Sequence, residues 1–205
     1  MSQPAPPAHR NFWDLAYDHG DHLEHWEALE TPPGLVEAIE RGWVGRQKTA
    51  LDIGCGAGRE ALFLAGQGVS VMGVDSSPVA LELARSRADE AGVVVDWREG
   101  DATRLPVPDN AIDFALDRGC FHVIDRKRRR RYAREVSRVL RPGARLLLYC
   151  ARDDDEELGL VGVSRQEIDR LFIIRGFECE INVPLSMEAR SGSLPAQRMV
   201  LRLTD

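Results

Sequence analysis

The chain has 205 residues, of which 43% are hydrophobic and 29% are charged, a composition that suits one compact domain with a sizeable core. Its formal net charge of −6 argues against general binding to nucleic acids or membrane surfaces. The cysteines (Cys55, Cys120, Cys150 and Cys179) form no Cys-x-x-Cys pair, and no signal-peptide or membrane-spanning run is evident. We therefore expect a cytoplasmic protein with reduced thiols.

Short helices are expected first, at residues 11–18, 22–29 and 31–42. We expect residues 1–34 to form an N-terminal tail and helical cover, and residues 35–205 to form the main domain. Three histidines in the cover are spaced three residues apart: His19, His22 and His25. Gly20 and the drift of this spacing around a helix argue against a metal site, so no metal is expected.

From residue 49 onward, strand-like runs alternate with helical patterns. The strands are expected at residues 49–53, 69–75, 93–101, 111–117 and 144–151. The helices are expected at residues 59–68, 76–92, 126–143 and 164–176. Two last strand-like runs, residues 176–185 and 196–205, have no helix between them. This order predicts a Rossmann-like α/β fold, with a seven-stranded, mostly parallel sheet and a C-terminal antiparallel hairpin.

The segment "ALDIGCGAGREALFLAGQG" places a glycine-rich turn between a strand and a helix, an arrangement that presents backbone N–H groups to a ligand. A phosphate-binding loop is excluded because no Lys-Ser or Lys-Thr follows these glycines. The dinucleotide pattern G-x-G-x-x-A is matched by "GAGREA" from Gly56, and Asp75 lies near the spacing of a ribose-binding acid. An NAD-type oxidoreductase therefore stays open as an alternative.

"LDIGCGAG" also resembles the first motif of class I S-adenosylmethionine-dependent methyltransferases, in which Asp52 supplies the acid and Gly54, Gly56 and Gly58 the glycines. Three further segments resemble later motifs of that family in the right order: "GVDSSPVALELAR", "GDATRLPVPDNAIDFALD" and "VSRVLRPGARLLLY". The resemblance extends roughly from residue 35 to the C-terminus.

The resemblance implies S-adenosylmethionine as cofactor and S-adenosylhomocysteine as product. It places Asp75 at the ribose hydroxyls, Asp101 and the Ala102 amide at the adenine, and Asp52 at the methionyl ammonium. The full expected cofactor-binding set is Asp52, Gly54, Cys55, Gly56, Gly58, Asp75, Ser76, Asp101, Ala102, Leu116 and Asp117. Structural roles remain open for some of these residues, since Gly58 can simply begin a helix and Asp101 can belong to a turn.

The segment "LDRGCFHVID" is similar to the "DRG-x-F-H" segment of methyltransferases in the thiopurine and tellurite-resistance group, which act on small molecules. Asp117 and His122 are candidates for removing a proton from the acceptor, and Arg118 and His122 for binding it. Packing is an open alternative for His122, and an ion pair for Arg118. Cys120 is expected to be a buried structural thiol rather than a nucleophile.

Two further features concern the surroundings of the site. Trp13 and Tyr17 in the cover are expected to lie over the substrate and exclude water, or else to pack the cover onto the core. The basic run at residues 126–131 is expected to be a solvated helix face, so a nucleic-acid partner is not expected. The sequence thus predicts methylation of a small molecule, a thiol, another heteroatom or a metalloid. The alternatives are an NAD-type oxidoreductase and a non-catalytic S-adenosylmethionine-binding protein.

Overall fold

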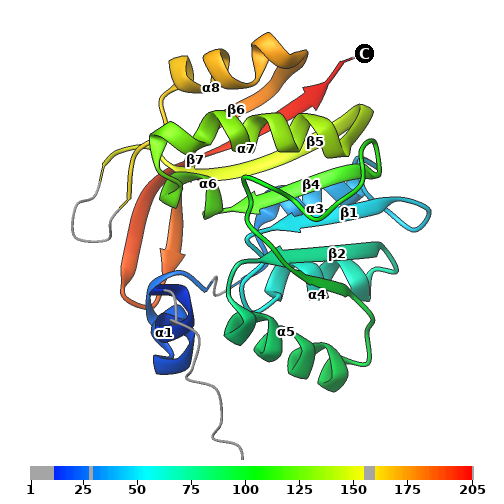
Figure 1. The fold of residues 1–205 in the computed structure, drawn as a ribbon, viewed down its shortest axis with the longest axis vertical. Helices are drawn as coiled ribbons and strands as arrows, with labels where there is room; N and C mark the ends of the chain where they lie inside the picture. Colours follow the sequence, from blue (N-terminus) through cyan, green and yellow to red (C-terminus); the bar gives the residue numbers. More distant parts are fainter. Residues whose placement is uncertain (1–11, 28–29, 155–159, 205) are drawn as a thin grey trace, which may run out of the picture.

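A computed structural model describes residues 12–27, 30–154 and 160–204, and within them the chain folds around one seven-stranded sheet (Figure 1). The strand order is β3-β2-β1-β4-β5-β7-β6. The strands are β1 (Thr49–Ile53), β2 (Ser70–Asp75), β3 (Asp96–Glu99), β4 (Ile112–Arg118), β5 (Leu140–Ala151), β6 (Phe177–Ala189) and β7 (Gly192–Leu203).

The first five strands pair in parallel, while β7 pairs antiparallel with both β5 and β6. This confirms the predicted fold, including the C-terminal hairpin. The strand order reverses at β1, which lies between β2 and β4. In open α/β sheets, ligands bind beyond the carboxyl ends of the strands at such a reversal. The glycine-rich turn directly follows β1 and therefore lies at this point.

The helices lie around the sheet and at its end (Figure 1). They are α1 (Phe12–His19), α2 (Asp21–His25), α3 (Pro33–Glu40), α4 (Arg59–Gly66), α5 (Pro78–Ala91), α6 (Cys120–Val123), α7 (Arg126–Val139), α8 (Arg165–Leu171) and the 3₁₀ turn η1 (Ile173–Arg175). The expected boundary after residue 34 falls within α3, and the proposed division into cover and main domain stays a prediction. None of the described helices is both long and apolar enough to cross a membrane.

Alternation of side chains along the strands produces two hydrophobic clusters, one for each face of the sheet. In β5, Leu146 and Leu148 belong to one cluster, while Leu147 and Tyr149 belong to the other. The first cluster includes apolar residues of α7 and α8, and the second includes residues of α3 and α4. Successive side chains of a strand point to opposite faces, so a continuous apolar strand fills both layers.

Among the described residues the cover is formed by residues 12–27, whose helices α1 and α2 lie beside α5 and the end of the β6–β7 hairpin (Figure 1). The Ser191 amide in the hairpin turn donates to the Glu24 carbonyl oxygen at 2.8 Å. The second cover helix is shorter than the expected residues 22–29, because α2 ends at His25. Glu27, beyond its end, forms an ion pair with Arg87 of α5. Residues 28 and 29, which the prediction included, lie outside the described residues.

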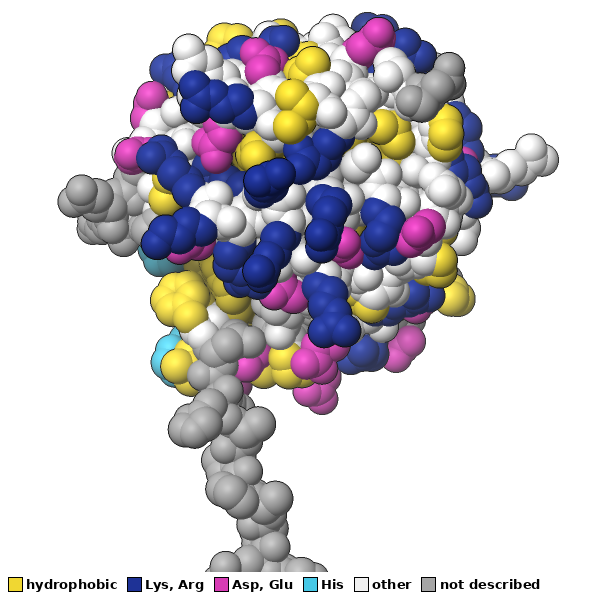
Figure 2. Space-filling view, turned by 45° about the horizontal axis from the view of Figure 1, so that its top comes forward, with side chains coloured by type: hydrophobic (Ala, Val, Ile, Leu, Met, Phe, Trp, Pro, Cys, Tyr) yellow, Lys and Arg dark blue, Asp and Glu magenta, His cyan; other side chains and the backbone are white. Residues whose placement is uncertain are grey.

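The basic run begins α7, where the Asp125 carboxylate accepts a hydrogen bond from the Lys127 amide. Figure 2 shows many Lys and Arg side chains on the side of the molecule to which α7 and α8 contribute. The expectation of a solvated face is wrong for Arg129, whose side chain is fully buried. Its guanidinium pairs with Glu167, donates to the carbonyl oxygens of residues 122, 124 and 161, and lies 4.9 Å from the Phe121 ring centroid.

Candidate active site

The three glycines of the turn all have positive φ angles: +68° at Gly54, +51° at Gly56 and +81° at Gly58. Each position is also crowded by a different neighbour. An added Cβ would lie 2.5 Å from Cys120 Cβ at the first position, 2.0 Å from Tyr17 Oη at the second, and 2.5 Å from Trp97 Cη2 at the third. Gly58 therefore serves the packing of α4, whereas Gly56 lies directly beneath the cover.

Asp75 ends β2 and holds the turn from its side. Its carboxylate accepts hydrogen bonds from the Gly56 amide at 2.8 Å and from the Ser77 amide at 2.9 Å. Burial nevertheless raises the pKa of Asp75 above its ordinary value. Ser76 follows it at the surface. The acid and the glycine turn are thus brought together as the sequence predicted.

Asp52 in β1 and Glu60 in α4 are both buried, and neither Asp52 Oδ2 nor Glu60 Oε1 has a hydrogen-bond partner among the described residues. Burial, followed by the charge of Glu60, raises the pKa of Asp52 well above its ordinary value. Two buried carboxylates with oxygens that accept no hydrogen bond favour binding of a cation. This donor set fits the ammonium group of a methionyl ligand lying on the turn.

Asp101 follows β3 and is exposed, with Ala102 beside it. The Thr103 amide and hydroxyl each donate to Asp101 Oδ1 at 2.8 Å, and Arg128 donates to Oδ2. Although partial burial opposes it, these hydrogen bonds lower the pKa of Asp101. The acids expected at three neighbouring strands, Asp52, Asp75 and Asp101, therefore all lie at the carboxyl ends of β1, β2 and β3.

Asp117 in β4 does not line the cavity beside the turn, and its side chain is fully buried. It accepts hydrogen bonds from the Tyr132 hydroxyl at 2.6 Å and from the Cys120 and Phe121 amides at 2.9 and 3.2 Å. Burial raises the pKa of Asp117 to about 7. These contacts fix the start of α6 and do not favour Asp117 as the base that removes an acceptor proton.

His122 is also buried, and its Nδ1 accepts a hydrogen bond from the Ala151 amide at 2.8 Å. The ring proton therefore lies on Nε2, which leaves no free lone pair for a general base. Burial, followed by the charge of Arg129, lowers the pKa of His122 to about 4. The geometry favours the packing alternative for this residue.

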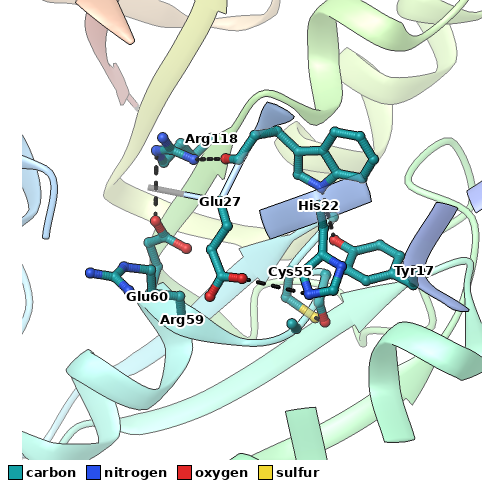
Figure 3. A pocket seen from close by; sticks show the side chains of 11 residues that line it. Tyr17, His22, Glu27, Cys55, Arg59, Glu60 and Arg118 are labelled. Carbon is teal, nitrogen blue, oxygen red and sulfur yellow. Dashed lines mark hydrogen bonds and ion pairs between the residues drawn. The ribbon is translucent and has the colours of Figure 1, made fainter. Parts of the chain in front are cut away.

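A cavity of about 50 Å³ lies between the glycine turn and the cover (Figure 3). Its walls include backbone of the turn and the side chains of Tyr17, His22, Trp26, Glu27, Glu60 and Arg118. Arg118 Nη1 donates to the Trp26 carbonyl oxygen at 2.8 Å, and its Nε lies 3.6 Å from Glu60 Oε1.

The other aromatic residue expected over the substrate, Trp13, does not line this cavity. It packs edge to face on Trp26, with ring centroids 5.7 Å apart, and so supports the cavity wall indirectly. Cys55 lines the cavity, and Cys120, which is half buried, lies against Gly54. Within the described part of the chain, no group of three or more metal-ligating side chains is placed to hold a metal ion.

Sequence reasoning missed six lining residues: His22, Trp26, Glu27, Ala57, Arg59 and Glu60. Only His22 carried a signal, as part of the histidine spacing, and that spacing was considered for metal binding. Glu60 lies two residues after the last glycine of the turn, where the first turn of a helix directs its side chain back toward the ligand-facing end.

The comparisons with known proteins agree with this geometry. Residues 50–143 match a family described as methyltransferase domain. A 2-heptyl-1-hydroxyquinolin-4(1H)-one methyltransferase of Mycobacteroides abscessus is 30% identical over 124 residues, which are 60% of this chain and 54% of that protein. The methyltransferase GfsG of Streptomyces halstedii is 34% identical over 140 residues, which are 62% of this chain and 49% of that protein.

Over residues 50–143 the chain therefore resembles S-adenosylmethionine-dependent methyltransferases. Its fold is also that of a S-adenosylmethionine-dependent methyltransferase from Methanosarcina mazei, with 25% identity, a TM-score of 0.70, and coverage of 81% of this chain and 97% of that one. A second similar structure comes from work on conversion of a disulfide bond into a thioacetal group during echinomycin biosynthesis. It is 26% identical with a TM-score of 0.79, and the match covers 94% of this chain and 90% of that one.

The cofactor of this methyltransferase domain is S-adenosylmethionine, and the turn and acids described above are the groups that fit it. The chain spans about half the length of the curated relatives it matches.

Proposed function

We propose that this protein transfers a methyl group from S-adenosylmethionine to a small-molecule acceptor. The observation that carries the proposal is the pair of buried carboxylates of Asp52 and Glu60 beside the glycine turn, each with an oxygen that accepts no hydrogen bond from the described residues. They supply the negative charge that an α-ammonium group requires. Asp75 would hold the ribose hydroxyls, and Asp101 with the Ala102 amide would hold the adenine.

The cofactor supplies an electrophilic methyl group on a sulfonium, and the protein's task is to orient the acceptor and exclude water. Alignment of this kind contributes as much as about 7–11 kcal/mol in well-oriented systems. The cover provides the water exclusion, since Tyr17 lies on Gly56 and Trp26 is held by Arg118. Ligand pockets are usually about 300–1,000 Å³, so a cavity of about 50 Å³ requires the cover to move outward for binding.

A small acceptor is supported by this enclosure and by the relative whose name specifies a hydroxyquinolone. The acceptor is proposed to be a thiol, another heteroatom or a metalloid, as in the thiopurine and tellurite-resistance group that the "DRGCFH" segment resembles. Arg118 is proposed to contact the acceptor, because it lines the cavity from the end of β4.

Isothermal titration calorimetry with S-adenosylhomocysteine and with NAD tests the cofactor assignment. We expect S-adenosylhomocysteine to bind and NAD not to bind. We expect Asp75→Ala to lower the affinity for S-adenosylhomocysteine at least tenfold, because the substitution removes the hydrogen-bond acceptor for the ribose and the partner of the Gly56 amide. Asp89→Ala, at an exposed position of α5, is the control and should bind normally.

Binding of NAD in place of S-adenosylhomocysteine would support the oxidoreductase alternative. Binding without release of labelled methyl groups to any thiol, phenol, amine or metalloid would support the non-catalytic alternative. Unchanged affinity of the Asp75 variant would contradict the role proposed for that carboxylate.

A further inference from the structure

His22 is a buried polar side chain without a hydrogen-bond partner. Its residue is 4% exposed, and among the described residues neither ring nitrogen has a partner within hydrogen-bond distance. It lies in the wall of the cavity that the glycine turn and the cover enclose (Figure 3). Buried polar groups are almost always paired in native proteins, so an unpaired one in a ligand cavity points to a partner that the ligand supplies.

The surroundings of His22 hold its ring in place without using its nitrogens. The Tyr17 ring packs against it at a centroid distance of 4.8 Å and an angle of 30°. Glu27 Oε2 lies 3.7 Å from Nε2, beyond hydrogen-bond distance. Arg87 of α5 donates hydrogen bonds of 2.7 and 3.2 Å to the two carboxylate oxygens of Glu27. Glu27 is therefore fixed beside the imidazole.

The charged groups around His22 suit a proton acceptor. Burial, together with Arg87, lowers the pKa of His22, while Glu27 and Asp21 act in the opposite direction. The ring is consequently neutral before the reaction, with a lone pair to offer. Once the ring gains a proton, the nearby carboxylate of Glu27 stabilises the positive charge. Asp117 and His122 do not suit this role, because both Asp117 oxygens already accept hydrogen bonds and the Ala151 amide uses the Nδ1 lone pair of His122.

We propose that His22 is the general base of the reaction and that the acceptor is a small aromatic compound with a hydroxyl group. This inference rests on the proposed function and narrows its substrate class. The rings of Tyr17 and Trp26 offer apolar walls to a flat molecule. An aromatic hydroxyl is mostly un-ionised near neutral pH and needs a base, whereas a thiolate or metalloid oxyanion already carries its lone pair in reactive form.

The step balances as a proton transfer coupled to a displacement at carbon. The acceptor O–H bond breaks, and its proton passes to an unprotonated nitrogen of His22. The oxygen lone pair forms the new bond to the methyl carbon. The cofactor supplies that methyl group, and the electron pair of the broken carbon–sulfur bond stays on sulfur. His22 then returns its proton to solvent when the cover opens.

A matched pair of acceptors, phenol and thiophenol, tests the role of His22. At pH 8 thiophenol is largely ionised and phenol is not, so only phenol needs the base. We expect wild-type protein to methylate both. We expect His22→Gln to lower the phenol rate by about 100-fold and the thiophenol rate much less. His19→Gln, at an exposed position of the same cover, is the control and should alter neither rate.

A second measurement does not depend on turnover. In protein labelled with ¹⁵N-histidine and loaded with S-adenosylhomocysteine, the His22 imidazole resonance is assigned from its absence in His22→Gln. We expect phenol to shift this resonance, and anisole, which has no hydroxyl proton, to leave it in place.

Three results would overturn the inference. The first is an equal loss of both rates in His22→Gln. The second is wild-type protein that methylates thiophenol alone or neither compound, and the third is a His22 resonance that ignores phenol. Calorimetry with S-adenosylhomocysteine on the same proteins separates these failures from failure of the proposed function, since the cofactor then still binds with unchanged affinity.

Discussion

The three glycines of the turn share a left-handed backbone but are required for different reasons. Gly54 makes room for Cys120, Gly58 for Trp97, and Gly56 for the hydroxyl of Tyr17. Only at Gly56 does the neighbour belong to the cover. The middle glycine therefore decides how closely the cover approaches the cofactor-binding turn, and substitution there should act on ligand binding more than on the core.

We expect Gly56→Ala to lower the affinity for S-adenosylhomocysteine more than tenfold, because the new methyl group would lie 2.0 Å from the present position of Tyr17 Oη. Gly92→Ala is the matched control. Gly92 also has a positive φ, +65°, but no atom lies within 4 Å of its added Cβ. Both variants carry a backbone cost of about 1 kcal/mol, measurable by urea unfolding. Calorimetry showing equal affinities for the two would contradict the crowding argument.

Asp117 links the stability of the protein to pH. Its pKa is about 7 in the folded protein against an ordinary 3.8, so the folded state binds this proton more tightly than the unfolded state. The contribution of this proton to the free energy of unfolding is complete below about pH 4, and it is lost as the pH rises through about 7. The size of the shift corresponds to about 4 kcal/mol.

We expect Asp117→Asn to remove this contribution, so that the difference in unfolding free energy between wild type and variant changes between pH 4 and 7. Urea unfolding at several pH values measures it. A difference that stays constant across that range would show that the pKa of Asp117 is not raised.

At the scale of elements, the cover is attached to the rest of the molecule by polar contacts rather than by the main core. Ser77 Oγ donates to Asp14 Oδ1 at 2.6 Å, Arg118 binds the Trp26 carbonyl oxygen, and Arg87 binds Glu27. Polar attachments of this kind open more readily than a hydrophobic core. This suits the outward movement of the cover that the proposed function requires.

We expect Arg87→Ala to loosen the cover while the sheet stays intact. Amide hydrogen exchange in residues 12–27 should become faster, and S-adenosylhomocysteine should associate faster, because the Glu27 anchor is lost. Arg85→Ala changes an exposed arginine of the same helix and serves as the control. Faster exchange spread over the whole sheet would indicate general destabilisation instead.

At the scale of the whole molecule, the sheet and the position of the turn could be predicted because local patterns encode them. Apolar runs near Leu51 and Leu147 fill two layers, and the glycines follow β1 directly. The cavity wall formed by His22, Glu27 and Arg118 could not be predicted as a unit. Its members come from the cover and β4, and only folding brings them together.

Burial of Arg129 was missed for the same reason. Its sequence neighbours are all basic and exposed, whereas its partners are the carbonyl oxygens of residues 122, 124 and 161 and the carboxylate of Glu167. A run of like charges indicates solvent exposure on average, but one position of a helix can still face inward when enough acceptors converge on it.

The turn of the β6–β7 hairpin reaches the cover through the Ser191 amide and the Arg190 guanidinium, which contact Glu24. None of the residues in that turn lines the cavity. Substitutions in this turn can therefore change the position of the cover, and with it the size of the molecules that enter the cavity. The residues proposed to bind the methyl donor would stay unchanged.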